Sequence, residues 1–483
     1  MKYVRIYLFA GLLLALPACK SELDINQDPG RLNSDQVTLP TLLSSAEQFT
    51  ANCYFGAAQY GAQYPQFLAG QAISNYTPYG FDQLWRPLYT DALPTLQDMI
   101  RRGEAQEAYN YAGVARILLG LDMLLAASIY GDLPYSQANQ GTSNLYPCYD
   151  SQQDLYQTHI ISLLDQGLAD LARPASPNPT LRTLSNEYVY GRFQAAGQQV
   201  PKWVRAGNGA KARYYLHLTK KNPAYYNQAI QFANQALTSN ADDLEVPYTA
   251  TGTNTIQNPS WFSFLGSATS RIMRPSSYLV NLMNGTGQYP GLVDPRLPLY
   301  ADRGTATSYV GVTPGAVVGQ AGATVNLTTN TWHARADAPI QVLTYPEIKF
   351  ILAESYFQTG NRTEAYTNYL AGIRASMEKV GVAEAQIAAY LASPLIGKGA
   401  EALQLSDIML QKYLALYLQM ETWTDMRRYQ YDPGVYLGLQ KPVDIQLPGS
   451  PWIQRSNVAD DEPGVNTCLP QFESQGSVLW LFQ

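Results

Sequence analysis

The chain has 483 residues, of which 46% are hydrophobic and only 14% are charged, and its formal net charge is −6 at pH 7. A negatively charged chain without a basic run lacks the electrostatic footprint that nucleic-acid binding requires. The four Cys and three His show no metal-ligand spacing, so a zinc site is not expected either.

The first 18 residues have the pattern of a secretory signal. Lys2 and Arg5 give a positively charged start, and an apolar run from Ile6 to Leu16 follows. This run is too short for a permanent membrane helix but suits a signal peptide. It ends in Leu-Pro-Ala-Cys, the pattern of a bacterial lipobox, so we expect cleavage before Cys19 and lipid on its thiol. The alternative is a plain secretory signal followed by a chance cysteine.

Residues 19–37 are polar and rich in turn formers, which is typical of a tether behind a lipid anchor. Residues 38–483 are expected to form one mostly α-helical domain, because apolar residues recur there at helical spacing. The stretch 109–130 is apolar nearly all round but carries Arg116 and Asp122, which indicates a buried helix rather than a membrane span. The expected helices cover residues 81–100, 109–130, 155–171, 202–218, 225–237 and 406–428, and two more lie between Tyr345 and Met377 on either side of residues 358–362.

Two of these helices, between Tyr345 and Met377, have the features of a tetratricopeptide unit. Small residues fall at the offsets where paired helices approach closely. Gly360 can end the first helix in a left-handed conformation, and Asn361 can cap the second. One such unit cannot bury its own apolar face, so further helix pairs are expected beside it, including one formed by 202–218 and 225–237.

Residues 249–340 differ in character from the rest of the chain. Gly, Thr, Asn and Pro dominate, helical periodicity is lost except near 276–283, and residues 304–334 contain no Lys, Arg, Asp or Glu. A loop-rich insertion of this length inside a compact domain is usually functional. The alternative is a set of short structural β-hairpins that cover the helices.

Several short motifs along the chain are similar to those of one protein family. Cys19 is followed by Leu-Asp-Ile-Asn-x-Asp-Pro, and the helix at 109–130 closes with Tyr-Gly-Asp-x-Pro-Tyr. A Lys-Trp-x-x-x-x-Asn segment begins at Lys202, Asp-Pro-Arg follows at 294–296, and Asp-x-Arg-Arg lies at 425–428. Together these motifs resemble the SusD/RagB family of nutrient-binding outer-membrane lipoproteins.

The resemblance implies a scaffold of tetratricopeptide-like helix pairs with long loops. It also implies a lipid-anchored receptor at the cell surface that captures an oligosaccharide or another nutrient. Such a receptor would act as a lid over a SusC-like TonB-dependent transporter in the outer membrane. Catalysis is not implied by the resemblance.

The sequence contains no nucleophile elbow, P-loop or dinucleotide fingerprint, so no cofactor is expected. Its acidic pairs, such as Asp242-Asp243 and Asp460-Asp461, do not by themselves assign an acid and a base at glycosidase separation. A helical-toroid glycoside hydrolase remains the enzyme alternative, because such proteins are also large, helical and rich in aromatic residues. A peptide-binding receptor of the same family is a second alternative.

Aromatic residues on loops are the candidate ligand contacts. Sugar rings pack their C–H groups on aromatic faces, while Tyr hydroxyls and Asn or Gln amides bond the sugar hydroxyls. Each such residue could instead be core packing. The candidates are Tyr76, Tyr79, Trp261, Phe262, Tyr309 and Trp332.

The disulfide state is left open by the sequence. After removal of the signal and lipidation of Cys19, three cysteines remain: Cys53, Cys148 and Cys468. An odd number leaves at least one of them unpaired within the chain.

Overall fold

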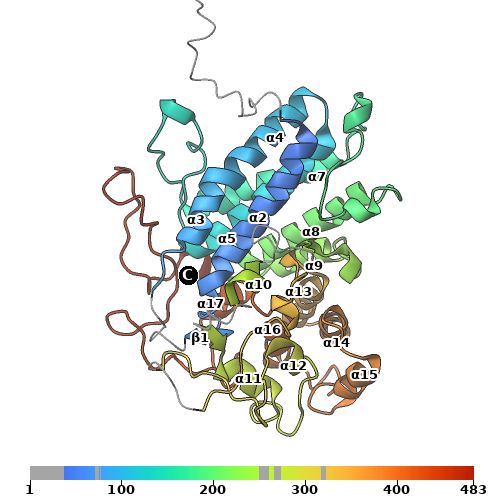
Figure 1. The fold of residues 1–483 in the computed structure, drawn as a ribbon, viewed down its shortest axis with the longest axis vertical. Helices are drawn as coiled ribbons and strands as arrows, with labels where there is room; N and C mark the ends of the chain where they lie inside the picture. The colour runs from blue at the N-terminus through green and yellow to red at the C-terminus, as the bar shows by residue number, and fades with distance from the viewer. Residues whose placement is uncertain (1–36, 71–75, 77, 250–259, 266–272, 317–321) are drawn as a thin grey trace, which may run out of the picture.

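The computed structural model describes residues 37–70, 76, 78–249, 260–265, 273–316 and 322–483. The signal segment, Cys19 and nearly all of the tether expected at 19–37 lie outside the described residues. The described chain is dominated by helices, as expected, with a helical scaffold and loop-rich segments beside it (Figure 1).

Helix α5 (Tyr109–Tyr130) lies at the centre of the N-terminal helices and contacts α2, α4, α7 and α8. It is long and apolar enough to cross a membrane, but its apolar stretch is entirely buried among these neighbours, as predicted. Its two charged residues have partners inside the protein, although one carboxyl oxygen of Asp122 makes no hydrogen bond among the described residues. Arg116 pairs with Asp170 and Glu104, and Asp122 accepts a hydrogen bond from the Thr50 hydroxyl at 2.9 Å.

The remaining N-terminal elements follow the predicted order, although π-helical turns interrupt two of the expected helices. These elements are α2 (Leu39–Gly61), α3 (Asp82–Arg86), η2 (Pro87–Ala92), α4 (Leu93–Ala105), η3 (Gly141–Ser143), α6 (Gln152–Asp154), η4 (Leu155–Ile160), α7 (Ile161–Leu171), η5 (Pro179–Leu181) and η6 (Gly191–Phe193).

The predicted tetratricopeptide-like pairs are confirmed. Helices α13 (Tyr345–Gln358) and α14 (Arg362–Lys379) pack against each other, and α8 (Gln199–His217) packs against α9 (Tyr225–Ala233). Gly360 has φ +85°, and the Asn361 side chain accepts from the Glu364 N–H at 3.2 Å. The two pairs contact each other through α13 and α9, which is how each covers the apolar face of the other.

The prediction of a single helix over 406–428 is wrong, because this part of the chain forms two helices. These are α16 (Leu405–Ala415) and α17 (Glu421–Arg428), and Leu418 between them has φ +65°. The intervening residues are helix formers, so the break arises from tertiary contacts rather than from propensity. It lets Tyr417 stack on Tyr300 with ring centroids 4.7 Å apart, and it aims Glu421 at α8.

Short strands occur as expected, but they pair between distant segments rather than in hairpins. Strand β1 (Leu68–Gly70) is antiparallel to β3 (Met273–Pro275), and β2 (Leu244–Val246) is antiparallel to β4 (Ile340–Leu343). Parts of the loop-rich region 249–340 are therefore bound to the scaffold at both of these sheets. The other elements are η7 (Leu218–Lys220), η8 (Asn240–Asp242), α10 (Ser260–Leu265), α11 (Ser277–Met283), α12 (Leu297–Tyr300), η9 (Trp332–Ala334), α15 (Glu384–Ala392) and η10 (Trp480–Phe482).

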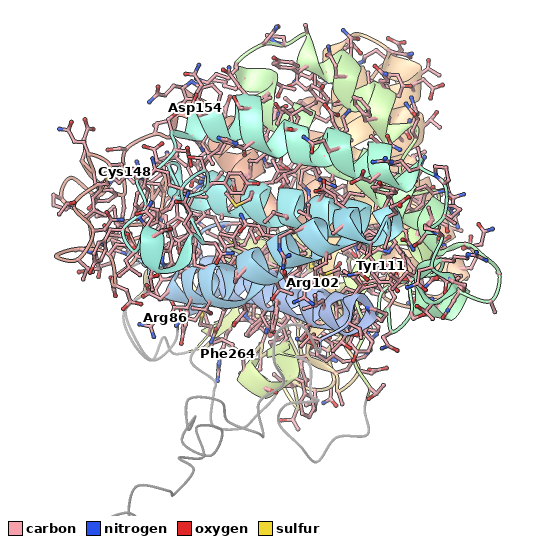
Figure 2. The ribbon with its side chains drawn as sticks, turned by 90° about the horizontal axis from the view of Figure 1, so that it is seen from above. Arg86, Arg102, Tyr111, Cys148, Asp154 and Phe264 are labelled. Atoms are coloured by element: carbon pink, nitrogen blue, oxygen red, sulfur yellow. A yellow bond between two sulfur atoms is a disulfide. The ribbon has the colours of Figure 1, made fainter. Side chains whose placement is uncertain are left out.

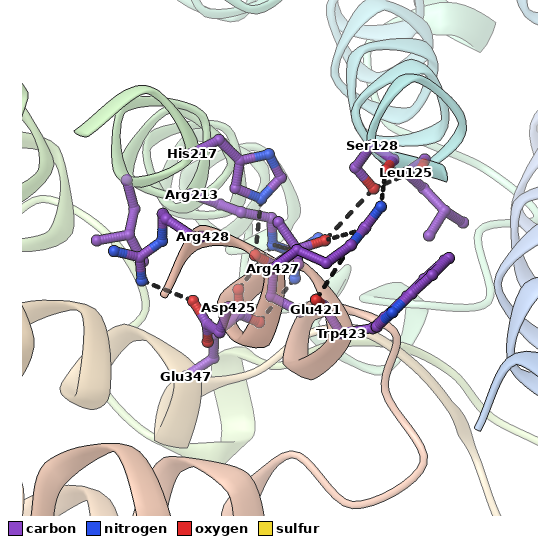
Figure 3. A network of polar contacts seen from close by, with 12 residues as sticks. Leu125, Ser128, Arg213, His217, Glu347, Glu421, Trp423, Asp425, Arg427 and Arg428 are labelled. Carbon is purple, nitrogen blue, oxygen red and sulfur yellow. Dashed lines mark hydrogen bonds and ion pairs between the residues drawn. The ribbon is translucent and has the colours of Figure 1, made fainter. Parts of the chain in front are cut away.

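A network of buried charges joins the C-terminal helices to α8 (Figure 3). Arg213 on α8 donates to Glu347 on α13 at 2.6 Å, and the His217 ring contacts Glu421 on α17 at 2.7 Å. Removing one partner of such a buried pair leaves an uncompensated charge, which typically costs about 3–5 kcal/mol. The network therefore fixes how these helices sit against one another.

A second part of the network contains the Asp-x-Arg-Arg motif of α17. Asp425 lies 2.7 Å from Lys412 and 2.7 Å from Arg428, and the Arg428 guanidinium is 2.5 Å from Glu354. Arg427 donates instead to the Ser128 carbonyl at the end of α5, at 2.5 Å (Figure 3). This motif is buried and structural.

A disulfide joins Cys148 to Cys468, which are 320 positions apart. It links the loop after α5 to the C-terminal segment, and the Tyr149 hydroxyl reinforces the link by donating to Glu462 at 3.1 Å. Cys53 on α2 is buried as a free thiol.

Candidate ligand-binding cleft

An open cleft of about 510 Å³ lies along α2 and α3. Figure 2 shows two of the residues around it, Arg86 and Phe264, at the same edge of the molecule. Amide side chains are prominent in its lining, and Phe55 supplies an aromatic ring. The lining residues are Asn52, Phe55, Gly56, Gln59, Asp82, Gln83, Arg86 and Pro87.

The base of the cleft is formed by a close approach of α2 and α3. A Cβ atom at Gly56 would overlap the carbonyl oxygen of Gln83, so only glycine allows the two helices to meet there. Asn52, Phe55 and Gln59 lie three and four positions apart on α2, which places them on one helix face. This face is held rigidly because the rest of α2 packs on α5 and α4.

Five aromatic rings gather beside the cleft and form what we call the aromatic cluster: Phe55, Tyr60, Tyr79, Trp261 and Phe264. Phe55 lies 5.2 Å from Trp261 and 6.2 Å from Phe264 between ring centroids. Tyr60 lies 5.5 Å from Phe264 and 4.9 Å from Tyr79. All of these rings except Trp261 are partly exposed, so the cluster presents aromatic surface to the solvent.

The Tyr79 hydroxyl joins the aromatic cluster to the cleft. It donates a hydrogen bond to the Gln83 side-chain oxygen. Burial, followed by the neighbouring Tyr60 and Asp82, raises the pKa of Tyr79 well above its usual value. The hydroxyl therefore stays protonated at neutral pH and remains a hydrogen-bond donor.

The charges at the cleft are engaged within the protein. Arg86 makes two hydrogen bonds of 3.0 Å to Asp461, and Asp82 accepts from the Asp460 N–H at 3.2 Å. The negative charge of Asp82 raises the pKa of Asp460, with a smaller contribution from burial. These contacts bring the C-terminal segment to one side of the cleft, which its sequence does not suggest.

The sequence-predicted contact residues fall in different environments. Tyr79 and Trp261 are part of the aromatic cluster, and Phe262 is partly buried beside Trp261 on α10. Tyr76 is 1% exposed, and its hydroxyl donates to the Tyr64 carbonyl at 2.9 Å. Tyr76 is therefore packed in the core.

The other two predicted residues lie apart from the cleft lining. Trp332 stands near the cations of Arg335 and Lys379, at 4.3 and 5.6 Å from its ring. Its short helix η9 contacts α10, which carries Trp261 of the aromatic cluster. Tyr309 lies 5.2 Å from the Arg303 guanidinium, in the loop after α12.

Sequence reasoning missed the contribution of α2. Phe55 and Tyr60 are separated from α10 by a long stretch of chain, and only the fold brings them together. A signal was nevertheless present, because Asn52, Phe55 and Gln59 form a polar-aromatic stripe at helical spacing. Phe264 lies about one turn after Trp261 on α10. It was missed because the sequence did not predict a helix there.

A family model and a set of solved structures point to one protein family. A family model described as "Starch-binding associating with outer membrane" matches residues 31–442. A search of curated proteins found no match to the sequence.

Solved structures with the same fold are numerous. A chitin-binding SusD homolog from Flavobacterium johnsoniae superposes with a TM-score of 0.73 at 18% identity, covering 92% of this chain and 98% of that one. A SusD homolog from Parabacteroides distasonis gives 0.72 at 20% identity, with 93% and 98% covered. A SusD/RagB family protein from Bacteroides thetaiotaomicron gives 0.69 at 20% identity, with 88% and 94% covered. At these identities the solved structures establish the shared fold alone. The family model matches most of the chain, and this match shows that the protein belongs to the SusD/RagB family.

Proposed function

We propose that the protein is a cell-surface receptor that captures a glycan in the cleft along α2 and α3. The observation that carries the proposal is the meeting of aromatic rings with amide side chains at one open site. Phe55 in the cleft lining and Phe264, 6.2 Å from it, are partly exposed rings against which a sugar ring can pack, and Asn52, Gln59 and Gln83 can bond the sugar hydroxyls.

A neutral glycan is the ligand class that the cleft favours. Arg86 is paired with Asp461 and Asp82 accepts from Asp460, so these charges already have partners within the protein. The family is described as starch-binding and one similar structure is chitin-binding, so α-glucans and chitin oligosaccharides are the first ligands to test.

The receptor would be held at the outer membrane by lipid on Cys19, with residues 19–37 as its tether and residues 38–483 as one binding domain. It would deliver the glycan to a SusC-like TonB-dependent transporter. The description of the family as associating with the outer membrane supports this location.

The test is calorimetric titration of the mature protein with malto-oligosaccharides, chito-oligosaccharides and a peptide mixture in turn. Binding of one glycan series that Phe55→Ala weakens supports the proposal. Binding of peptides alone would favour the peptide-receptor alternative. Co-purification of a barrel protein with the receptor from the native outer membrane tests the transporter partnership separately.

The enzyme alternative is tested at the acidic pair beside the cleft. Asp82 raises the pKa of Asp460, and a carboxyl group with a raised pKa is what a glycosidase uses as its general acid. We expect no hydrolysis of any glycan that binds. Turnover that persists through purification and disappears in Asp460→Asn would place the protein among glycoside hydrolases instead.

A further inference from the structure

A second cavity, of about 280 Å³, lies beside α11 and shares no lining residue with the cleft. In Figure 1, α11 lies at the lower edge of the molecule, well below α3. The cavity is lined by one face of α11, by Gly287 and Gln288 after it, and by two crossing loops at 313–314 and 437–443.

The walls of this cavity, which we call the α11 pocket, are tied together by hydrogen bonds. The Gln66 amide donates to the Gln440 carbonyl at 2.7 Å, and the Val443 N–H donates to the Pro314 carbonyl at 3.2 Å. The Gly287 N–H donates to the carbonyl of Asn281 at 3.0 Å. The pocket is thus a built feature of the fold, of a size that suits a single small ring.

The α11 pocket combines an apolar wall with polar groups at its rim. Tyr278 and Leu282 are 6% and 3% exposed, and the Tyr278 ring is held in place by Tyr413 at 5.2 Å. The Tyr278 hydroxyl is buried and has no hydrogen-bond partner among the described residues. The hydroxyl is therefore enclosed by the protein, and Tyr278 offers the pocket its ring rather than a polar group. The amide-bearing residues of the lining are Gln66, Asn281, Gln288 and Gln440.

The charged lining of the α11 pocket is positive. Lys441 is exposed and is the one charged residue among those that line it. Within the described part of the chain, Lys441 makes no ion pair. The carboxylate of a ligand could therefore form an ion pair with Lys441. In the cleft along α2 and α3, by contrast, Arg86 is already paired with Asp461.

We propose that the α11 pocket is a second ligand site, which binds a single-ring sugar acid. The apolar faces of Tyr278 and Leu282 would pack against the ring, the amides of Asn281, Gln288 and Gln440 would bond its hydroxyls, and Lys441 would pair with its carboxylate. This site recognises an acidic compound, whereas the cleft along α2 and α3 takes a neutral glycan.

The probe is glucuronate, with glucose as its neutral counterpart, and both are measured by ligand-observed NMR on the folded protein. We expect glucuronate to bind more tightly than glucose, and Lys441→Gln to weaken glucuronate roughly ten- to hundredfold, since charge-assisted hydrogen bonds have this worth. Tyr278→Phe keeps the ring and removes only the buried hydroxyl, so we expect it to bind glucuronate like the parent. Lys220→Gln, which removes an exposed charge on η7, is the matched control and should bind like the parent.

Three results would overturn the proposal. Glucuronate that binds no better than glucose would remove the acidic preference. Equal loss of affinity in Lys441→Gln and Lys220→Gln would make the effect one of net charge. Loss of glucuronate binding in Phe55→Ala but not in Lys441→Gln would place the compound in the cleft along α2 and α3. Circular dichroism on each variant confirms that it is folded.

Discussion

Phe55 and Trp261 meet edge to face, with ring centroids 5.2 Å apart and ring planes at 88°. Phe55 comes from α2 and Trp261 from α10, so this contact fastens part of the loop-rich region to the first helix of the described chain. Aromatic pairs of this geometry contribute about 0.5–1.5 kcal/mol beyond their buried area. Trp261 is 5% exposed and acts as the support, while Phe55, which lines the cleft, and Phe264 beside it are only partly buried.

We therefore expect Phe55→Ala and Phe264→Ala to weaken glycan binding by removing a contact with the glycan, whereas Trp261→Ala would act only by removing the support of these rings. Loss of one stacking ring at a binding site typically costs about 1–3 kcal/mol, or roughly five- to a hundredfold in Kd. Calorimetry measures the change, and circular dichroism checks the fold. Tyr188→Ala is the control, because Tyr188 is 54% exposed outside the aromatic cluster. Normal binding by both Phe variants would show that these rings do not form the platform.

Trp332→Ala tests whether the binding site extends beyond the cleft to η9. Trp332 lies on η9, which contacts α10 but does not line the cleft. We expect this variant to bind the glycan within a factor of about three of the parent, a change below 1 kcal/mol. A loss as large as that of Phe55→Ala would extend the site to η9.

The disulfide between Cys148 and Cys468 closes a loop of 320 positions. Disulfides typically stabilise a fold by about 2–4 kcal/mol, mainly by restricting the unfolded chain. We expect reductant to lower the Tm of the parent protein. The double variant Cys148→Ser/Cys468→Ser should start at that lower Tm and show no further change with reductant. A parent Tm that reductant leaves unaltered would contradict a stabilising role.

Stability should also depend on pH through Asp122. Burial raises the pKa of Asp122 from 3.8 to about 8, against a smaller opposing effect of the Thr50 hydroxyl. The folded protein then holds a proton that the unfolded chain releases, so the contribution of Asp122 to stability falls as pH rises from about 4 to about 8.

Asp122→Asn keeps an acceptor for Thr50 and removes this titration. We expect the Tm of the variant relative to the parent to rise between pH 5 and pH 8 in thermal unfolding. Glu401→Gln, which removes an exposed carboxyl group, is the control and should leave this difference small. A parent–variant difference that is constant across this range would mean that Asp122 is not protonated in the fold.

The lipid anchor is tested by Cys19→Ala. The apolar run that ends at Leu-Pro-Ala-Cys motivates the expectation that this variant loses lipid labelling and leaves the membrane fraction. Multiple acyl chains hold a protein firmly at a membrane, whereas one chain holds it only weakly. Retention and labelling of Cys19→Ala at parent levels would refute the lipoprotein assignment.

Local patterns in the sequence were enough for most helices and for the family. The stripe from Tyr345 to Met377, the left-handed Gly360 and the Asn361 cap all depend on residues within a few positions of one another, so they could be predicted. The family motifs were also recognisable, and they turn out to be structural. Asp294 and Arg296 form a buried ion pair at 2.6 Å, and Trp203 donates to Glu187 at 2.6 Å. Motifs of this kind identify the scaffold and not the ligand.

What only the tertiary structure decided depends on contacts between distant residues. The break at Leu418, the pairing of β1 with β3 and the partner of Cys148 have no local signal, because each is selected by what lies across the core. The same holds for the binding cleft. Tyr79 and Trp261 could be named from the sequence as loop aromatics, but Phe55 joins them only because Gly56 lets α3 settle on α2 and the Phe55–Trp261 contact brings α10 alongside.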